Sequence, residues 1–241
     1  MSQFPSQFEQ NRPWSLEYGA DDRAVFNFFN AVYAWMFVGL AVTASVAYAC
    51  SQSPAMLQMI YAGRGVMLVG GLVAFAIAWG VQSAAHRISP TAATMLFLLY
   101  AAVVGVLISY VFVIYEMSIL ISSFVITGGV FGGMSLYGYF TKRDLTSMGS
   151  ILIMCAWGLL LASVVNIFFA SNALSWIITY AVLAVFIGLT AYDTQKLKEM
   201  AHATQGDATM AARYAIVGSL HLYVDFINIF LAIARILGSR R

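Results

Sequence analysis

Two aspartates stand in stretches of sequence that otherwise lack charge. Asp225 is the only charged residue in 214–234, and Asp193 directly follows the uncharged residues 145–192. A carboxylate in the middle of an apolar helix costs about 2.5–3.5 kcal/mol on membrane-insertion scales, so it is expected to face a partner or a wet cavity. We therefore interpret Asp225 as functional. Asp193 ends its apolar segment. Contact with water or pairing with Lys196 therefore explains this acid as readily as a functional role does.

The neighbours of Asp225 are also polar. His221 lies one helical turn before Asp225 and Asn228 one turn after it, so the three side chains share a face of the same helix. A polar stripe on an otherwise apolar helix favours a position at the centre of a helix bundle. Tyr192 stands beside Asp193 and offers a further oxygen near that acid.

The composition identifies the elements that must position these residues. The chain is 61% hydrophobic and 9% charged, whereas a soluble domain is roughly 45–50% apolar and about 25% charged. Such a chain needs lipid as its solvent, and a helix that spans the hydrocarbon takes about 20 apolar residues. We predict an all-α integral membrane protein, with a polar tail over 1–25 and a seven-helix transmembrane domain over 26–238. The predicted spans are 26–50, 66–85, 92–114, 119–140, 148–169, 174–192 and 212–237.

The distribution of basic residues predicts a cytoplasmic N-terminus, since Lys and Arg collect in cytoplasmic loops. The net charge of +2 lies mainly in these short loops, so it does not indicate binding to nucleic acid. Seven crossings would place Arg240 and Arg241 outside, against this rule. Either the last segment crosses despite the rule, or it enters and returns. The predicted inside loops hold Arg87, Lys142, Arg143, Lys196, Lys198 and Arg213, and the outside loops hold Arg64.

Four glycines recur on one face of the segment 119–140. Small residues at this spacing let helix backbones approach closely, which favours tight packing inside the bundle. A gating hinge or a dimer contact are the alternatives. The glycines are Gly128, Gly129, Gly132 and Gly133.

Three stretches carry a resemblance to a known family. They are YGYFTKRDLTSMGS at 137–150, GLTAYDTQKLK at 188–198 and LYVDFINIFLAIARILG at 222–238. The sequence resembles the Bax inhibitor-1 family, also called transmembrane Bax inhibitor motif proteins, and it is most similar to the bacterial YccA-like branch. The resemblance extends over 26–238. It implies a seven-helix fold with a central last helix and a place in the bacterial inner membrane.

The resemblance also implies a function. Family members of this kind are pH-sensitive calcium leaks with two sensor aspartates, which correspond here to Asp193 and Asp225. An arginine that latches the first aspartate corresponds to Arg87. Two carboxylates close together in a low dielectric cannot both ionise cheaply, so protons and calcium would compete for the pair. Calcium takes six to eight oxygens; with Asn228, Tyr192, carbonyls and water the shell would be partial and binding weak.

His221 departs from the bacterial pattern, which has a small or apolar residue there, so it is a candidate modulator of the pH response. Calcium is expected as the transported ion, with no resident cofactor.

Two other functions compete with a leak channel. Intramembrane aspartyl proteases also use acids on their sixth and seventh helices, but they resemble one another in a Gly-x-Gly before the second acid. Leu222, Tyr223 and Val224 stand there instead, so we expect no enzyme. The second alternative is a regulator without transport of its own. The resemblance implies stress protection and restraint of a membrane-bound ATP-dependent protease, for which the tail over 1–25 offers a contact.

Overall fold

The computed structural model describes residues 14–61, 64–83 and 89–239, and the regular structure in these ranges consists of α-helices. The predicted all-helical class is confirmed. The helices are α1 (Trp14–Ser51), α2 (Pro54–Tyr61), α3 (Arg64–Ser83), α4 (Pro90–Ile108), α5 (Val111–Ile114), α6 (Met117–Phe140), α7 (Thr146–Phe169), α8 (Asn172–Ala203) and α9 (Ala208–Gly238).

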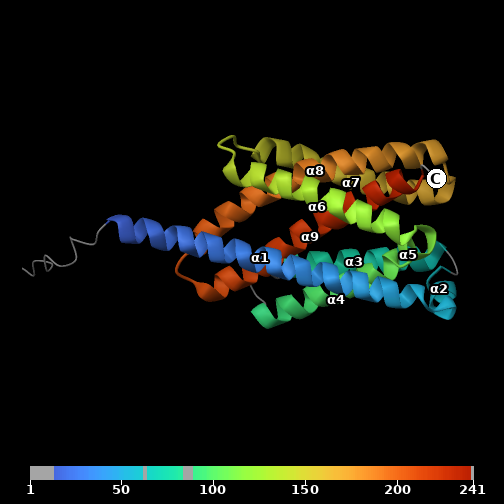
Figure 1. Ribbon diagram of the computed structural model, residues 1–241, viewed down its shortest axis with the longest axis horizontal. Helices are drawn as coiled ribbons and strands as arrows, with labels where there is room; N and C mark the ends of the chain where they lie inside the picture. The colour runs from blue at the N-terminus through green and yellow to red at the C-terminus, as the bar shows by residue number, and fades with distance from the viewer. Residues whose placement is uncertain (1–13, 62–63, 84–88, 240–241) are drawn as a thin grey trace, which may run out of the picture.

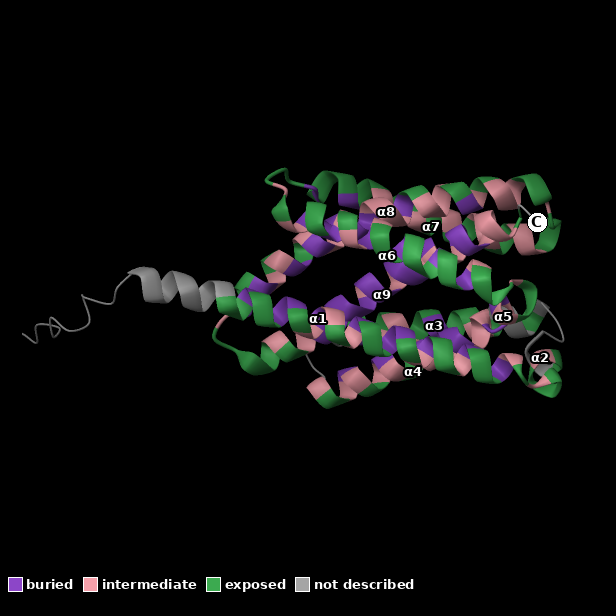
Figure 2. Ribbon diagram, viewed as in Figure 1, coloured by how far each residue is buried: buried purple, intermediate pink, exposed green. Residues whose placement is uncertain are grey.

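The long helices form two groups with α9 between them. Figure 1 shows α6, α7 and α8 on one side, α1, α3 and α4 on the other, and α9 running obliquely from one group to the other. Helix α9 contacts α1, α3, α4, α6 and α8, whereas α7 packs on α8. Figure 2 shows the result as burial, with α9 buried along most of its length and α7 largely exposed.

In the described part of the chain, six helices are long and apolar enough to cross a membrane. They lie within α1, α4 with α5, α6, α7, α8 and α9, and they match six of the seven predicted spans. The other predicted span, 66–85, overlaps α3 over residues 66–83, and the apolar part of α3 covers only Val69–Gln82. An apolar stretch this short is not by itself a spanning signal, so the seventh crossing stays a prediction. The most apolar window of α9 is 72% buried, and that of α7 is 0% buried.

Several helix ends differ from the predicted boundaries. Helix α8 continues to Ala203, so Asp193 lies inside a helix, and the prediction that it closes the sixth segment is wrong. Lys196 and Lys198 accordingly belong to α8 and not to a loop. The residues after Asp193 are mostly Gln, Lys, Leu, Glu, Met and Ala, which favour helix whether or not lipid surrounds them. Hydropathy thus marks the apolar part of a helix and misses its polar extension.

The two ends of the chain also refine the predictions. Helix α1 begins at Trp14, within the predicted polar tail, while residues 1–13 lie outside the described ranges. Helix α9 is continuous over Ala208–Gly238, so this segment does not turn back on itself. Asp207 caps its start by accepting a hydrogen bond from the Met210 N–H at 2.9 Å. Gly206, with φ of 89°, makes the preceding turn in a conformation that residues with a side chain rarely adopt.

The glycines of α6 divide into two kinds. A Cβ placed on Gly138 would collide with the backbone of Ala191, so this glycine lets α6 and α8 approach closely. A Cβ on any of the four glycines singled out by spacing would meet no atom within 4 Å. The expected tight packing of Gly128, Gly129, Gly132 and Gly133 is therefore wrong. They lie on a more exposed face of α6, whereas its packed face is formed by other residues along the helix: Leu120, Ser123, Thr127, Phe131, Ser135 and Gly138.

We expect Gly138→Ala to lower the stability of the purified protein by about 1–3 kcal/mol, the usual cost of forcing an extra group into a tight contact. Gly133→Ala is the matched control on the same helix. It should leave the stability unchanged or raise it by up to about 1 kcal/mol through helix propensity. Thermal unfolding in detergent measures both changes. Equal midpoints for the two variants would contradict the assignment of Gly138 as the contact point.

Candidate functional site

Three residues close to Asp193 pack helix α8 against α6 and α7. Ala191 packs against Gly138 of α6, and Tyr192 packs against Gly149 of α7. Thr194 is fully buried and its hydroxyl lies 3.4 Å from Ser135 of α6. The residues directly before and after Asp193 therefore face α6 and α7. Because a helix turns about 100° per residue, this arrangement leaves the Asp193 side chain directed toward α9.

The aromatic residues on either side of Asp225 fix the rotation of helix α9 about its own axis. The Tyr223 hydroxyl lies 2.6 Å from the Thr43 hydroxyl of α1, and Thr43 donates to the carbonyl of Ala101 on α4 at 2.9 Å. Phe226 packs edge-to-face against Phe131 of α6, with ring centroids 5.5 Å apart. These contacts fasten two faces of α9 to opposite groups of helices. Asp225 is left on the face that meets α8.

The two acids meet. Asp225 is 2% exposed and Asp193 is half-buried, and their carboxyl groups lie close enough together to form a hydrogen bond when one of them is protonated. Among the described residues, no donor reaches the Oδ2 atom of Asp225. Two ionised carboxylates only accept hydrogen bonds. A proton shared by the two side chains, or a cation between them, would satisfy this buried oxygen.

The described residues offer the two acids few acidic, thiol or imidazole neighbours. Within the described ranges there is no cluster of three or more His, Cys, Asp or Glu side chains that could hold a metal ion. A cation at this point would have two carboxylates as its charged ligands, while calcium takes six to eight oxygens. The geometry therefore suits proton sharing and loose, transient cation contact more than a permanent metal centre.

The remaining predicted residues are distributed differently. His221 lies near Asp193, and its Nε2 atom is buried with no hydrogen-bond partner among the described residues. The Tyr192 hydroxyl lies 3.4 Å from Lys196 Nζ, on the α7 side of α8. Asn228 donates from Nδ2 to the Val224 carbonyl at 2.8 Å, within its own helix. Arg87, the predicted latch, lies outside the described residues.

One residue near the acids has a role that the sequence did not indicate. Gln195 accepts a hydrogen bond from the Leu145 N–H and donates to the Arg143 carbonyl, both at 2.8 Å. It thereby fastens the turn between α6 and α7 to α8, two residues after Asp193. No sequence signal separates this glutamine from a solvated one, because its partners are backbone groups of a turn about 50 residues earlier.

These features define an integral, multi-pass helical membrane protein with an enclosed pair of acids. Residues 25–241 match the family described as Inhibitor of apoptosis-promoting Bax1. The chain belongs to this family, the Bax inhibitor-1 family, which confirms the resemblance seen in the sequence.

Three bacterial relatives illustrate the similarity. The inner membrane protein YbhL of Escherichia coli (strain K12) is 45% identical over 212 residues, which cover 87% of this chain and 90% of that protein. An uncharacterized protein of Borreliella burgdorferi is 42% identical over 214 residues, covering 89% and 92%. The uncharacterized protein YrjE of Lactococcus lactis is 34% identical over 219 residues, covering 88% and 90%. The similarity thus extends over nearly the whole length of each protein.

The turn held by Gln195 contains an acid whose titration tests the local geometry. Asp144 Oδ1 accepts a hydrogen bond from the Thr146 N–H at 2.8 Å. Hydrogen bonds from the side chain and the backbone of Thr146 hold the pKa of the exposed Asp144 carboxyl below its ordinary value. The stabilisation they give is complete above the ordinary pKa, about 3.9, and is lost as the pH falls through the lowered value.

We therefore expect the Asp144 carboxyl, followed by NMR of the ¹³C-labelled protein, to titrate below about pH 3.9, the value of a free aspartate. Thr146→Val removes the larger of the two causes and retains the backbone N–H, so the midpoint should rise toward the ordinary value. An ordinary midpoint in both proteins would show that this hydrogen bond does not form in solution.

Proposed function

We propose that this protein is a pH-sensitive passive calcium leak in which Asp193 and Asp225 sense the proton and gate the pathway. The observation that carries the proposal is the meeting of these two acids, from α8 and α9, with a buried carboxylate oxygen that no donor of the described residues reaches. Membership of the Bax inhibitor-1 family supports it, because the sequence resemblance assigns the sensor to these same two positions.

The proposed switch follows from the charge of the pair. When the pair holds one proton, a carboxyl donates to a carboxylate and ties α8 to α9. When that proton leaves, two like charges about 4 Å apart repel by roughly 4 kcal/mol at an effective dielectric constant of 20. Separation of the helices, or entry of a divalent cation between them, relieves the repulsion. The leak therefore increases as the pH rises and the pair loses its proton.

The surrounding charges set where this change occurs. Lys196 on α8 and His221 on α9 both interact with Asp193, and a positive charge on either favours the ionised pair. We further propose that Arg87 forms an alternative latch by pairing with one acid when the pathway is closed. With two acids and few other oxygens, calcium is held weakly and released quickly, as conduction requires.

We extend the proposal to the arrangement in the membrane. Helix α3 has 20 residues, which at about 1.5 Å per residue reach roughly 30 Å, the thickness of the hydrocarbon core. We propose that α3 is the seventh crossing and that α9 is the central helix, which its extensive burial supports. The charge distribution supports a cytoplasmic N-terminus. The printed name of YbhL, an inner membrane protein, supports the same location here.

A flux assay in proteoliposomes tests the gate. The wild-type calcium leak should increase from pH 6 to pH 8, and Asp193→Asn and Asp225→Asn should each flatten this dependence, because a single remaining acid can neither share a proton with a partner nor repel one. Asp207→Asn is the matched control, since Asp207 is an exposed acid that caps α9 and asparagine caps a helix equally well. This variant should retain the wild-type pH profile.

The proposal fails if both acid-pair variants leak calcium with the wild-type dependence on pH. It also fails if the wild-type protein, correctly folded in the same vesicles, passes no calcium at any pH in this range. Circular dichroism and the thermal midpoint of each reconstituted variant distinguish a loss of gating from a loss of structure.

A further inference from the structure

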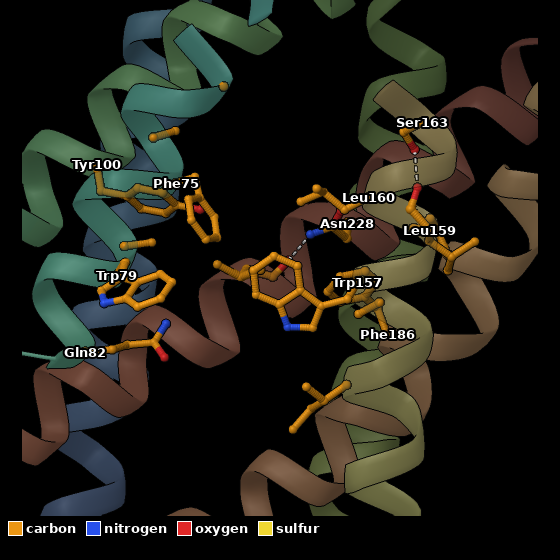
Figure 3. Close-up of a pocket in the computed structure, with 17 residues that line it drawn as sticks. Phe75, Trp79, Gln82, Tyr100, Trp157, Leu159, Leu160, Ser163, Phe186 and Asn228 are labelled. Carbon is orange, nitrogen blue, oxygen red and sulfur yellow. Dashed lines mark hydrogen bonds between the residues drawn. The ribbon is translucent and has the colours of Figure 1, made fainter. Parts of the chain in front are cut away.

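A large cavity lies between the two groups of helices. Its volume is about 820 Å³, and five helices line it: α3, α4, α7, α8 and α9. Figure 3 shows α3, with Phe75 and Trp79, facing α7, with Trp157 and Leu160, across this space. Cavities of this size accommodate molecules of several tens of atoms. The cavity is therefore large enough for a ligand and not merely a packing defect.

The cavity is continuous with the surface that contacts lipid. Its walls include Trp79, 60% exposed, and Trp157, 47% exposed. Helix α7 buries no residue of its most apolar window, so its outer face lies against the bilayer. Between α3 and α7 the rings of Phe75 and Trp157 meet edge-to-face, 5.5 Å apart. The apolar outer surface of α3 and α7 is thus continuous with the lining of the cavity at these two rings.

The cavity offers little to water. One N–H of the Asn228 amide and the hydroxyl proton of Ser163 are already used within their own helices, by the carbonyls of Val224 and Leu159 at 2.8 and 2.7 Å. Nearly all other lining side chains are aromatic or aliphatic. Buried water typically needs two to four polar partners, and an empty cavity would forfeit the dispersion contacts of its walls. Hydrocarbon from the surrounding bilayer is the medium that satisfies both conditions.

We propose that the cavity binds one acyl chain of a bilayer phospholipid. The chain enters between α3 and α7 past Phe75 and Trp157 and reaches Val224 on α9. The polar part of the lipid lies toward Trp79 and Gln82, near the end of α3, because tryptophan and amide side chains suit the boundary between hydrocarbon and headgroups. The bound chain fills the cavity between α3 and α7. This inference rests on the cavity alone and is independent of the calcium proposal.

Photolabelling of the intact protein tests the inference. The protein is reconstituted in phosphatidylethanolamine and phosphatidylglycerol vesicles that contain a phospholipid with a diazirine on one acyl chain. After illumination, mass spectrometry locates the adducts. We expect adducts inside the cavity, on Val224 or Tyr100, in addition to those on Met154, which is 72% exposed on α7 and lies outside the cavity.

Filling the cavity provides the matched comparison. Gly71 lines the cavity and Gly158 does not, and a Cβ on either would meet no atom within 4 Å. Gly71→Phe should reduce the labelling of Val224 and Tyr100 several-fold and leave that of Met154 unchanged. Gly158→Phe should leave all three unchanged. Similar thermal midpoints of the two variants would exclude misfolding as the cause of the difference.

Two results would overturn the proposal. The first is labelling by the lipid probe at Met154 with none at Val224 or Tyr100, which means that acyl chains contact the outer surface only. The second is labelling of Val224 by a water-soluble diazirine that reaches the intact protein from the aqueous phase, which means that the cavity is hydrated. Neither result depends on whether the protein passes calcium.

Discussion

A carboxyl group inside a bilayer must be enclosed by protein and matched with a proton, a cation or a donor, and the structure is arranged around the need to do this for Asp225. The aspartate is 2% exposed, and five helices contact the helix that carries it. Tyr223 joins α9 to α1 and α4, and Phe226 joins it to α6. These contacts leave a single direction for the acid, toward Asp193. The outer helices can then present apolar surface to lipid, and α7, which packs on α8, buries no residue of its most apolar window.

The sequence predicts the class of fold well because the bilayer imposes a simple rule on apolar length. Six of seven predicted spans correspond to long apolar helices. Asp225 could be singled out because one acid in an apolar helix is costly. The meeting with Asp193 could not be worked out from spacing, since it depends on how α8 is rotated. That rotation is set by Gly138 and Gly149, whose partners lie more than 40 residues away, and only the resemblance to a family connected the two acids.

The errors of prediction have physical causes of their own. Hydropathy follows side-chain transfer into lipid and does not register a helix that continues into water, so Asp193 was placed at a helix end. The four glycines of α6 satisfy the spacing of a packing motif, yet the glycine that packs is Gly138. A spacing rule describes one helix, whereas packing depends on where a second helix lies. Gln195 was overlooked for the same reason, because its partners are backbone atoms of a distant turn.

The attachment of Gln195 to the turn between α6 and α7 has a mechanical consequence. Asp193 and Gln195 are two residues apart on a rigid helix, so a rotation of α8 that changes the separation of the acids also shifts the carbonyl of Arg143 and the amide of Leu145. Lys142, Arg143 and Asp144 in that turn are exposed. A charged, exposed turn is therefore attached to the helix that carries Asp193. Under the proposed switch, molecules that never enter the membrane would encounter a different surface in each protonation state.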